Sequence, residues 1–181
     1  MRIVFVFLIS IFLVTASGCG YTTSSLLPPG MDSIHVDNFA NKINPAKEVS
    51  DKRASYSYWP NLETDITRAV IDGFIFDRHL DIDRESKAAL VLKGELMSFR
   101  QYPLSYDKSD TPNVEEFRIE ILVNIELYDN ESGKLMWKED SFLGESTYDV
   151  AGPNAVTEAE GVREAVKDLS ARIVERVVEA W

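Results

Sequence analysis

The sequence is poor in cysteine, in basic residues and in long apolar runs. Its single cysteine, Cys19, leaves no pair for a disulfide and no cysteine cluster for zinc. Lys and Arg number 19 against 30 Asp and Glu, for a net charge of −11, and such a chain repels nucleic acid and anionic membranes alike. No run after the amino terminus approaches the roughly 20 apolar residues that span a bilayer. A disulfide scaffold, a nucleic-acid binder and a multispanning membrane protein are therefore excluded.

Motifs of catalysis are also missing. The sequence has no Gly-x-Ser-x-Gly elbow, no Walker loop and no glycine-rich dinucleotide turn. Its two histidines, His35 and His79, do not stand at ligand spacing from each other. Asp77, Asp81 and Asp83 crowd around His79, but a solvated helix end accounts for them better than a metal site. We expect no enzyme, no catalytic residue, no metal site and no cofactor beyond a covalent lipid.

The amino terminus has the form of a secretory signal peptide. Arg2 precedes an apolar run over residues 3–14, too short to span a bilayer, and small residues then lead to Cys19. Residues 16–19, Ala-Ser-Gly-Cys, resemble the lipobox of bacterial lipoproteins, although leucine is commoner than Ala16 at its first position. The resemblance implies that residues 1–18 are removed and that acyl chains on Cys19 anchor the protein. The alternative is an ordinary signal peptide whose removal leaves a free thiol.

Residues 19–30 are expected to form a short lipidated tether. The ten residues from Cys19 to Pro28 reach at most roughly 35 Å when extended, so the protein would stay close to its own membrane. Gly20 occupies the place where aspartate often marks retention in the inner membrane, so the likeness to other lipoproteins favours the outer membrane. Residues 31–181 have the length of a single domain.

Alternating and helical apolar patterns predict the elements of this domain. Six apolar residues recur at strict period two over residues 117–127, which indicates a long half-buried strand. Thr157 and Glu160 have the spacing of a capping box before a last helix. Residues 102–107, Tyr-Pro-Leu-Ser-Tyr-Asp, are expected to end the second strand. The predicted strands cover residues 33–39, 88–100, 117–127 and 135–148, and the predicted helices run from Pro60 to about residue 80 and from residue 157 to 181.

The predicted fold is α+β: a four-stranded mixed sheet with two amphipathic helices on one face, in the order β-α-β-β-β-α. The first two strands enclose a helix, which favours a parallel pair joined by a right-handed crossover. The remaining strands would form an antiparallel meander. The second sheet face would carry apolar side chains among charges, either as a partner surface or as an ordinary exposed face; these are Val91, Met97, Phe99, Leu122 and Tyr128.

The order of several short motifs resembles the LptE family of lipopolysaccharide-assembly lipoproteins. That resemblance implies an outer-membrane lipoprotein, held in the periplasmic leaflet, that plugs and assembles the LptD β-barrel for insertion of lipopolysaccharide into the outer leaflet. The motifs are Cys19-Gly20-Tyr21, Leu27-Pro28-Pro29-Gly30, Tyr102-Pro103-Leu104-Ser105-Tyr106-Asp107, Gly133-Lys134-Leu135-Met136-Trp137 and Arg172-Ile173-Val174-Glu175-Arg176.

The same resemblance implies contact with lipopolysaccharide itself. Phosphates call for clustered cations, and the candidate ligands are Arg100, Lys108 and Arg118, around the connection between the second and third long strands. Carboxylates in the same region, such as Asp107 and Asp110, would cancel much of their field, so an ordinary solvated loop is the alternative. A second function also stays open, a lipoprotein regulator or pilotin of a cell-wall synthase or secretin. The short tether favours the barrel.

Overall fold

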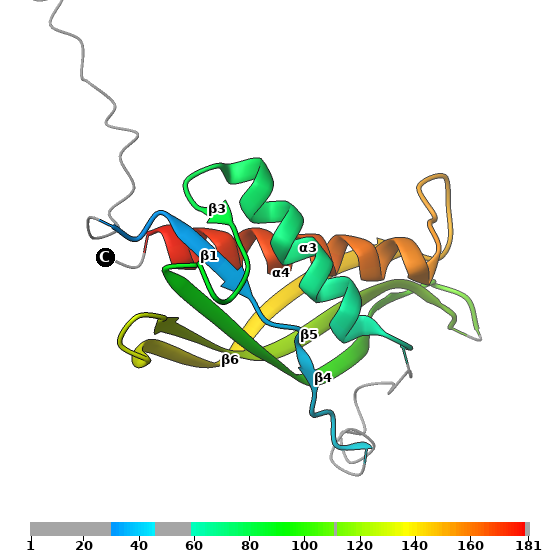
Figure 1. Cartoon of the computed structure of the whole chain (residues 1–181). Helices are drawn as coiled ribbons and strands as arrows, with labels where there is room; N and C mark the ends of the chain where they lie inside the picture. The colour runs from blue at the N-terminus through cyan, green and yellow to red at the C-terminus, as the bar shows by residue number, and fades with distance from the viewer. Residues whose placement is uncertain (1–29, 46–58, 111, 180–181) are drawn as a thin grey trace, which may run out of the picture.

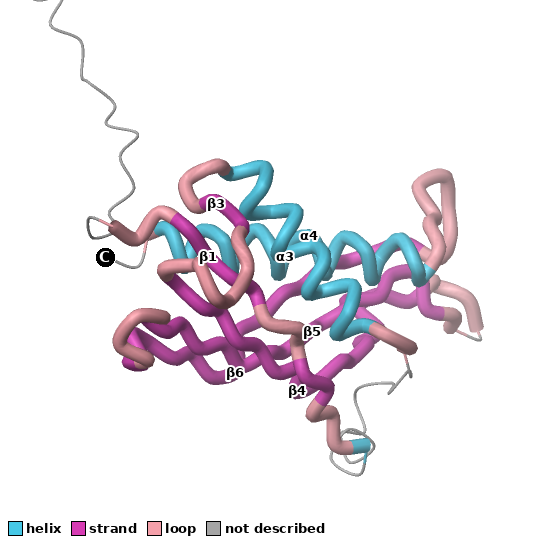
Figure 2. The backbone as a smooth tube through the Cα atoms, in the orientation of Figure 1, coloured by secondary structure: helices cyan, strands magenta, loops and turns pink. Residues whose placement is uncertain are grey.

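The computed structural model describes residues 30–45, 59–110 and 112–179, so the predicted signal peptide, Cys19 and the tether up to residue 29 lie outside it. The described chain forms one mixed sheet and two long helices (Figures 1 and 2). In chain order the elements are β1 (Ser33–Val36), β2 (Ala40–Asn41), α3 (Leu62–Asp77), β3 (Asp81–Ile82), β4 (Leu90–Tyr106), β5 (Val114–Asp129), β6 (Lys134–Asp149) and α4 (Glu158–Val178).

The sheet is built around three long strands. Its order is β3-β1-β4-β5-β6, with the short β2 also paired to β4. β1 runs parallel to β4, and β4, β5 and β6 follow as an antiparallel meander. The α+β class, the parallel first pair and the meander are confirmed. The sheet exceeds the predicted four strands by β2 and β3, two-residue strands too short to leave a periodic pattern.

Both helices lie on the same side of the sheet, as predicted (Figure 1). α4 begins with the predicted capping box, in which the Thr157 hydroxyl accepts from the Glu160 backbone N–H and the Glu160 carboxylate accepts from the Thr157 N–H. α3 begins at Leu62, two residues after Pro60. Gly144 of β6 lets α4 come close, because a Cβ added there would lie 2.4 Å from the Leu169 Cβ.

The core lies between the helices and the sheet. Every second residue of β5 faces the core, and the residues between them face the opposite side of the sheet. The residues of α3 and α4 that complete it recur at helical spacing. The largest fully buried side chains are Phe74, Phe99, Ile34, Leu62, Ile66, Leu80, Leu90, Leu92, Leu96, Ile119, Ile121 and Ile125.

The segment from Tyr102 to Tyr106 does not end the second long strand, as the sequence predicted, but continues it. β4 remains paired with β5 there, and Pro103 lies opposite Phe117. Proline is tolerated in an edge position, and β4 is an edge at this point, since the described strands on its other side reach only to Leu96. A register shift follows between Pro103 and Ser105. The prediction that the strand ends here was wrong, because Pro103 occupies an edge position of the sheet, where a proline does not interrupt the strand.

Phe99 belongs to the core and not to the second sheet face. A register shift lies between Leu96 and Ser98, so that the extra residue, Met97, reverses the alternation along β4. Phe99 consequently points inward and is only 1% exposed. Leu122 and Tyr128 do lie on the second face, where no described helix covers them.

Candidate functional site

Two of the three predicted cations meet on the helix-free face of the sheet. Arg100 of β4 lies opposite Glu120, and Arg118 of β5 lies opposite Tyr102, which makes the two arginines diagonal neighbours across the strand pair. Lys108 is exposed in the connection between β4 and β5. At the usual rise of a strand it lies about 20 Å further along the hairpin. The structure therefore brings Arg100 and Arg118 together and places Lys108 apart from them.

The two arginines are already engaged by neighbouring side chains. Arg118 lies 4.0 Å from carboxylate oxygens of both Glu120 and Glu145. The Arg100 guanidinium donates to the Tyr102 hydroxyl at 3.4 Å. The Arg118 side chain is 42% exposed, so solvent weakens its ion pairs. An anion would compete with these carboxylates for the arginines, which makes this a weak phosphate site at most.

A line of charged contacts crosses the same face. On β5 the Tyr128 hydroxyl donates to the Glu126 carboxylate at 2.6 Å, and Lys138 of β6 reaches the same carboxylate at 3.2 Å. Lys93 of β4 lies over the Tyr128 ring, 5.2 Å from its centre, and 4.0 Å from Asp37. We call Asp37, Lys93, Glu126, Tyr128 and Lys138 the charged ladder. It connects three long strands and the end of β1.

Three members of the ladder shift one another's pKa values. The Tyr128 hydrogen bond, with help from Lys138, holds the pKa of Glu126 below its ordinary value. The hydrogen bond to Glu126 raises the pKa of Lys138, and the same carboxylate raises that of Tyr128. The alternation of β5 already predicted that Glu126 faces away from the core. Lys138 could not be placed from the sequence, because β6 contains a left-handed residue, Ser141, and has no clean alternation.

A groove of about 760 Å³ lies between α3 and α4, on the opposite side of the molecule. Its lining is mainly apolar and includes Trp59, Gly73 and Val166. Phe76, at its edge, is 89% exposed, which is unusual for so large an apolar side chain. The groove was not predicted, since its walls come from two helices far apart in the sequence.

The cations around this groove are each paired within their own helix. Arg68 lies 4.0 Å from Asp65, and Lys167 lies 3.3 Å from Glu164. Arg163 lies 3.6 Å from Glu160. The cations of the groove wall thus already have carboxylate partners within their own helices.

Neither helix of the described chain has the length and apolar character needed to cross a membrane. The class that emerges is a small α+β domain, with both helices on one face of a mixed sheet and a charged opposite face. The sequence model of the family described as "LptE: Lipopolysaccharide-assembly" matches residues 31–181. The chain therefore belongs to the LptE family, whose members are outer-membrane lipoproteins of lipopolysaccharide assembly.

Solved structures are similar to this chain at low sequence identity. The hypothetical protein CT253 from Chlamydia trachomatis superposes with a TM-score of 0.51 at 10% identity, over 81% of this chain and 95% of that one. A putative lipoprotein from Caulobacter crescentus CB15 gives 0.43 at 18% identity, over 68% and 85%. The PelC dodecamer from Paraburkholderia phytofirmans gives 0.46 at 16%, over 82% and 88%. A comparison with curated protein sequences finds no match.

Proposed function

We propose that the protein is anchored to the outer membrane by a lipid on Cys19 and occupies the lumen of a large LptD-like β-barrel, which it helps to assemble for lipopolysaccharide insertion. The observation that carries the proposal is the family match over residues 31–181, combined with a sheet face that no described helix covers. The lipid anchor is supported by the lipobox-like residues that end at Cys19.

The charged ladder supports a polar surrounding for the sheet face. Along each strand of a wide outer-membrane barrel, polar side chains that face the lumen alternate with apolar side chains that face the lipid. Glu126 is bound by both the Tyr128 hydroxyl and Lys138, and Lys93 lies over the Tyr128 ring, so the face can meet a polar wall with fewer side chains to order on binding. A sheet face with only apolar side chains would instead suit contact with lipid or with the apolar core of another domain.

Photo-crosslinking in cells tests this assignment. A photoreactive residue at Glu145, exposed on the sheet face, should give an adduct with a large β-barrel protein. The same residue at Glu164, on the helix side, serves as the matched position and shows whether contact is confined to the sheet. Adducts from Glu164 alone would overturn the assigned face. Adducts with a cell-wall synthase or a secretin would instead favour the regulator or pilotin function.

Direct contact with lipopolysaccharide is proposed for Arg100 and Arg118, which lie together on the sheet face, with Lys108 as a separate contact at the hairpin end. Their existing bonds to Tyr102, Glu120 and Glu145 predict weak, salt-sensitive binding. Binding of purified lipopolysaccharide to an Arg100→Ala, Arg118→Ala double variant should fall several-fold. An Arg163→Ala variant, altered on the helix side, should bind normally. Equal binding by all three proteins would contradict this contact.

A further inference from the structure

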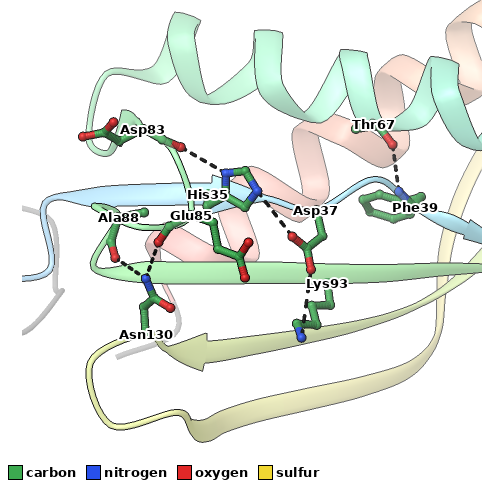
Figure 3. A network of polar contacts seen from close by, with 9 residues as sticks. All are labelled: His35, Asp37, Phe39, Thr67, Asp83, Glu85, Ala88, Lys93 and Asn130. Carbon is green, nitrogen blue, oxygen red and sulfur yellow. Dashed lines mark hydrogen bonds and ion pairs between the residues drawn. The ribbon is translucent and has the colours of Figure 1, made fainter.

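At one edge of the sheet, a histidine and two carboxylates converge from separate parts of the chain (Figure 3). A ring nitrogen of His35 and one carboxylate oxygen from each of Asp37 and Glu85 lie within 4.8 Å of one another. His35 belongs to β1, Asp37 follows it, and Glu85 lies in the connection between β3 and β4. Among the described residues, no other group of three such side chains comes this close.

A backbone group outside the cluster selects the tautomer of His35. The Nδ1 atom of His35 lies 3.1 Å from the Asp83 carbonyl oxygen. A carbonyl can only accept, so Nδ1 carries the proton. The second nitrogen, Nε2, then offers a lone pair when the ring is neutral. Metal-binding histidines use this same arrangement, in which a backbone carbonyl orients the ring and fixes the tautomer.

The Nε2 atom faces an acceptor and not a donor. It lies 3.3 Å from the Asp37 Oδ1 atom, and a neutral Nε2 and a carboxylate oxygen repel each other at that distance unless a cation lies between them. Only a second proton on His35 or a bound cation satisfies the pair. Lys93, 4.0 Å from the other Asp37 oxygen, Oδ2, approaches that carboxylate from its far side.

From this geometry we infer a binding site for a divalent transition-metal ion of the zinc class, held by His35 Nε2, Asp37 and Glu85. Zinc accepts imidazole nitrogen and carboxylate oxygen at about 2.0–2.2 Å, which places tetrahedral ligand atoms about 3.3 Å apart. His35 and Asp37 already have that separation. Glu85 is exposed, so rotation of its side chain brings its oxygen in, and water takes the fourth position.

The backbone that carries the ligands is held in place. His35 lies in a strand paired on both sides, to β3 and to β4. The Asp37 N–H donates to the Leu92 carbonyl at 2.9 Å. The Asn130 side chain donates to the carbonyls of Glu85 and Ala88, at 2.6 and 2.8 Å, and so fixes the turn that presents Glu85. A metal here would clamp the β3–β4 connection onto β1.

The inference revises the expectation of no metal, which rested on the sequence spacing of the two histidines. His79 provides the internal control. It pairs with Asp77 at 2.7 Å, yet it belongs to no group of three ligands among the described residues. A His79→Ala variant therefore removes a histidine beside a carboxylate without touching the inferred site.

The test is calorimetric titration of the full lipidated chain, stripped with chelator and held in detergent, with Zn²⁺. We expect one site, with an affinity at least about tenfold weaker in His35→Ala and in Glu85→Gln, and unchanged in His79→Ala. Glu85→Gln alters an exposed side chain, so its reading stands even if His35→Ala fails to fold.

Three results of the Zn²⁺ titrations would overturn the inference. They are the absence of Zn²⁺ binding at submillimolar concentration, retention of binding in both His35→Ala and Glu85→Gln, and loss of binding in His79→Ala. Ca²⁺, which prefers all-oxygen sites, serves as the second probe. Ca²⁺ binding as tight as that of Zn²⁺ and indifferent to His35→Ala would show an acidic surface without a transition-metal site, and would likewise overturn it.

Discussion

The Thr67 hydroxyl of α3 accepts a hydrogen bond from the Phe39 backbone N–H at 2.9 Å (Figure 3). The same hydroxyl donates to the Glu63 carbonyl at 2.8 Å. Both Thr67 and Phe39 are buried. The pair ties the segment between β1 and β2 to the helix layer. The Phe39 ring occupies the space above Gly94, where an added Cβ would lie 2.1 Å from the ring.

Replacing Thr67 by valine keeps its shape and removes the acceptor. The buried Phe39 N–H is then left without its partner, which costs about 1–3 kcal/mol. Thr67→Ser keeps the hydroxyl and is the matched control. Urea unfolding should show a clear loss of unfolding free energy for the valine variant and a smaller loss for serine. A larger loss for serine than for valine would mean that the buried methyl group, and not the hydrogen bond, matters at this position.

The register of β5 can be tested with adjacent residues. Ile121 is 0% exposed in the core, whereas Leu122 lies on the helix-free face. Ile121→Lys buries an unpaired charge and should unfold the domain, while Leu122→Lys should fold. Far-ultraviolet circular dichroism distinguishes the two. A folded Ile121→Lys beside an unfolded Leu122→Lys would show that the strand faces the other way.

Close packing of α4 on the sheet predicts a cost at Gly144. A Cβ there would lie 2.4 Å from the Leu169 Cβ and 2.8 Å from its Cα, so the helix backbone has to move. We expect Gly144→Ala to lose about 1–3 kcal/mol of unfolding free energy, measured by urea denaturation. Thr147→Ala, three residues along the same strand and less buried, should be close to neutral. A Gly144→Ala variant as stable as the wild type would contradict this packing.

The charged ladder predicts a pH dependence. The folded-state pKa of Glu126 lies below its ordinary value of 4.5. The ionised Glu126 side chain therefore stabilises the fold fully above pH 4.5, and this contribution is lost as the pH falls through the folded-state pKa. Tyr128→Phe removes the main cause of the depression. The stability gap between wild type and Tyr128→Phe should therefore be largest at neutral pH and close below pH 4.5.

Unfolding free energies measured at several pH values check this prediction. Tyr106→Phe is the control, since Tyr106 is 52% exposed at the end of β4, whereas the hydroxyl that binds Glu126 belongs to Tyr128. If the difference in unfolding free energy between wild type and Tyr128→Phe does not change with pH, the Tyr128 hydroxyl does not lower the pKa of Glu126.

Sequence patterns predicted the parts of the fold that local physics decides. The alternation of β5 and the capping box of Thr157 and Glu160 depend on neighbours in sequence, and both are confirmed. Pro103 and Phe99 were misplaced for one reason: an edge position and a register shift depend on which strand lies alongside. Such pairing cannot be read from one strand alone.

The site was predictable to a smaller extent. Arg100 and Arg118 could be named as neighbours of one strand connection, but the approach of Glu145 to Arg118 depends on the pairing of β5 with β6. The cluster at His35 needs Glu85, which is presented by a turn far along the sequence. Contacts of this kind arise from topology, which short motifs do not encode.

The central claim is tested most directly by affinity purification of the full-length, tagged chain from detergent-solubilised membranes, with identification of the proteins that co-elute. The proposal predicts one large β-barrel protein in stoichiometric amount, with a Cys19→Ser variant recovering much less of it because the lipid anchor is lost. Recovery of a cell-wall synthase or a secretin in place of a barrel would contradict the account.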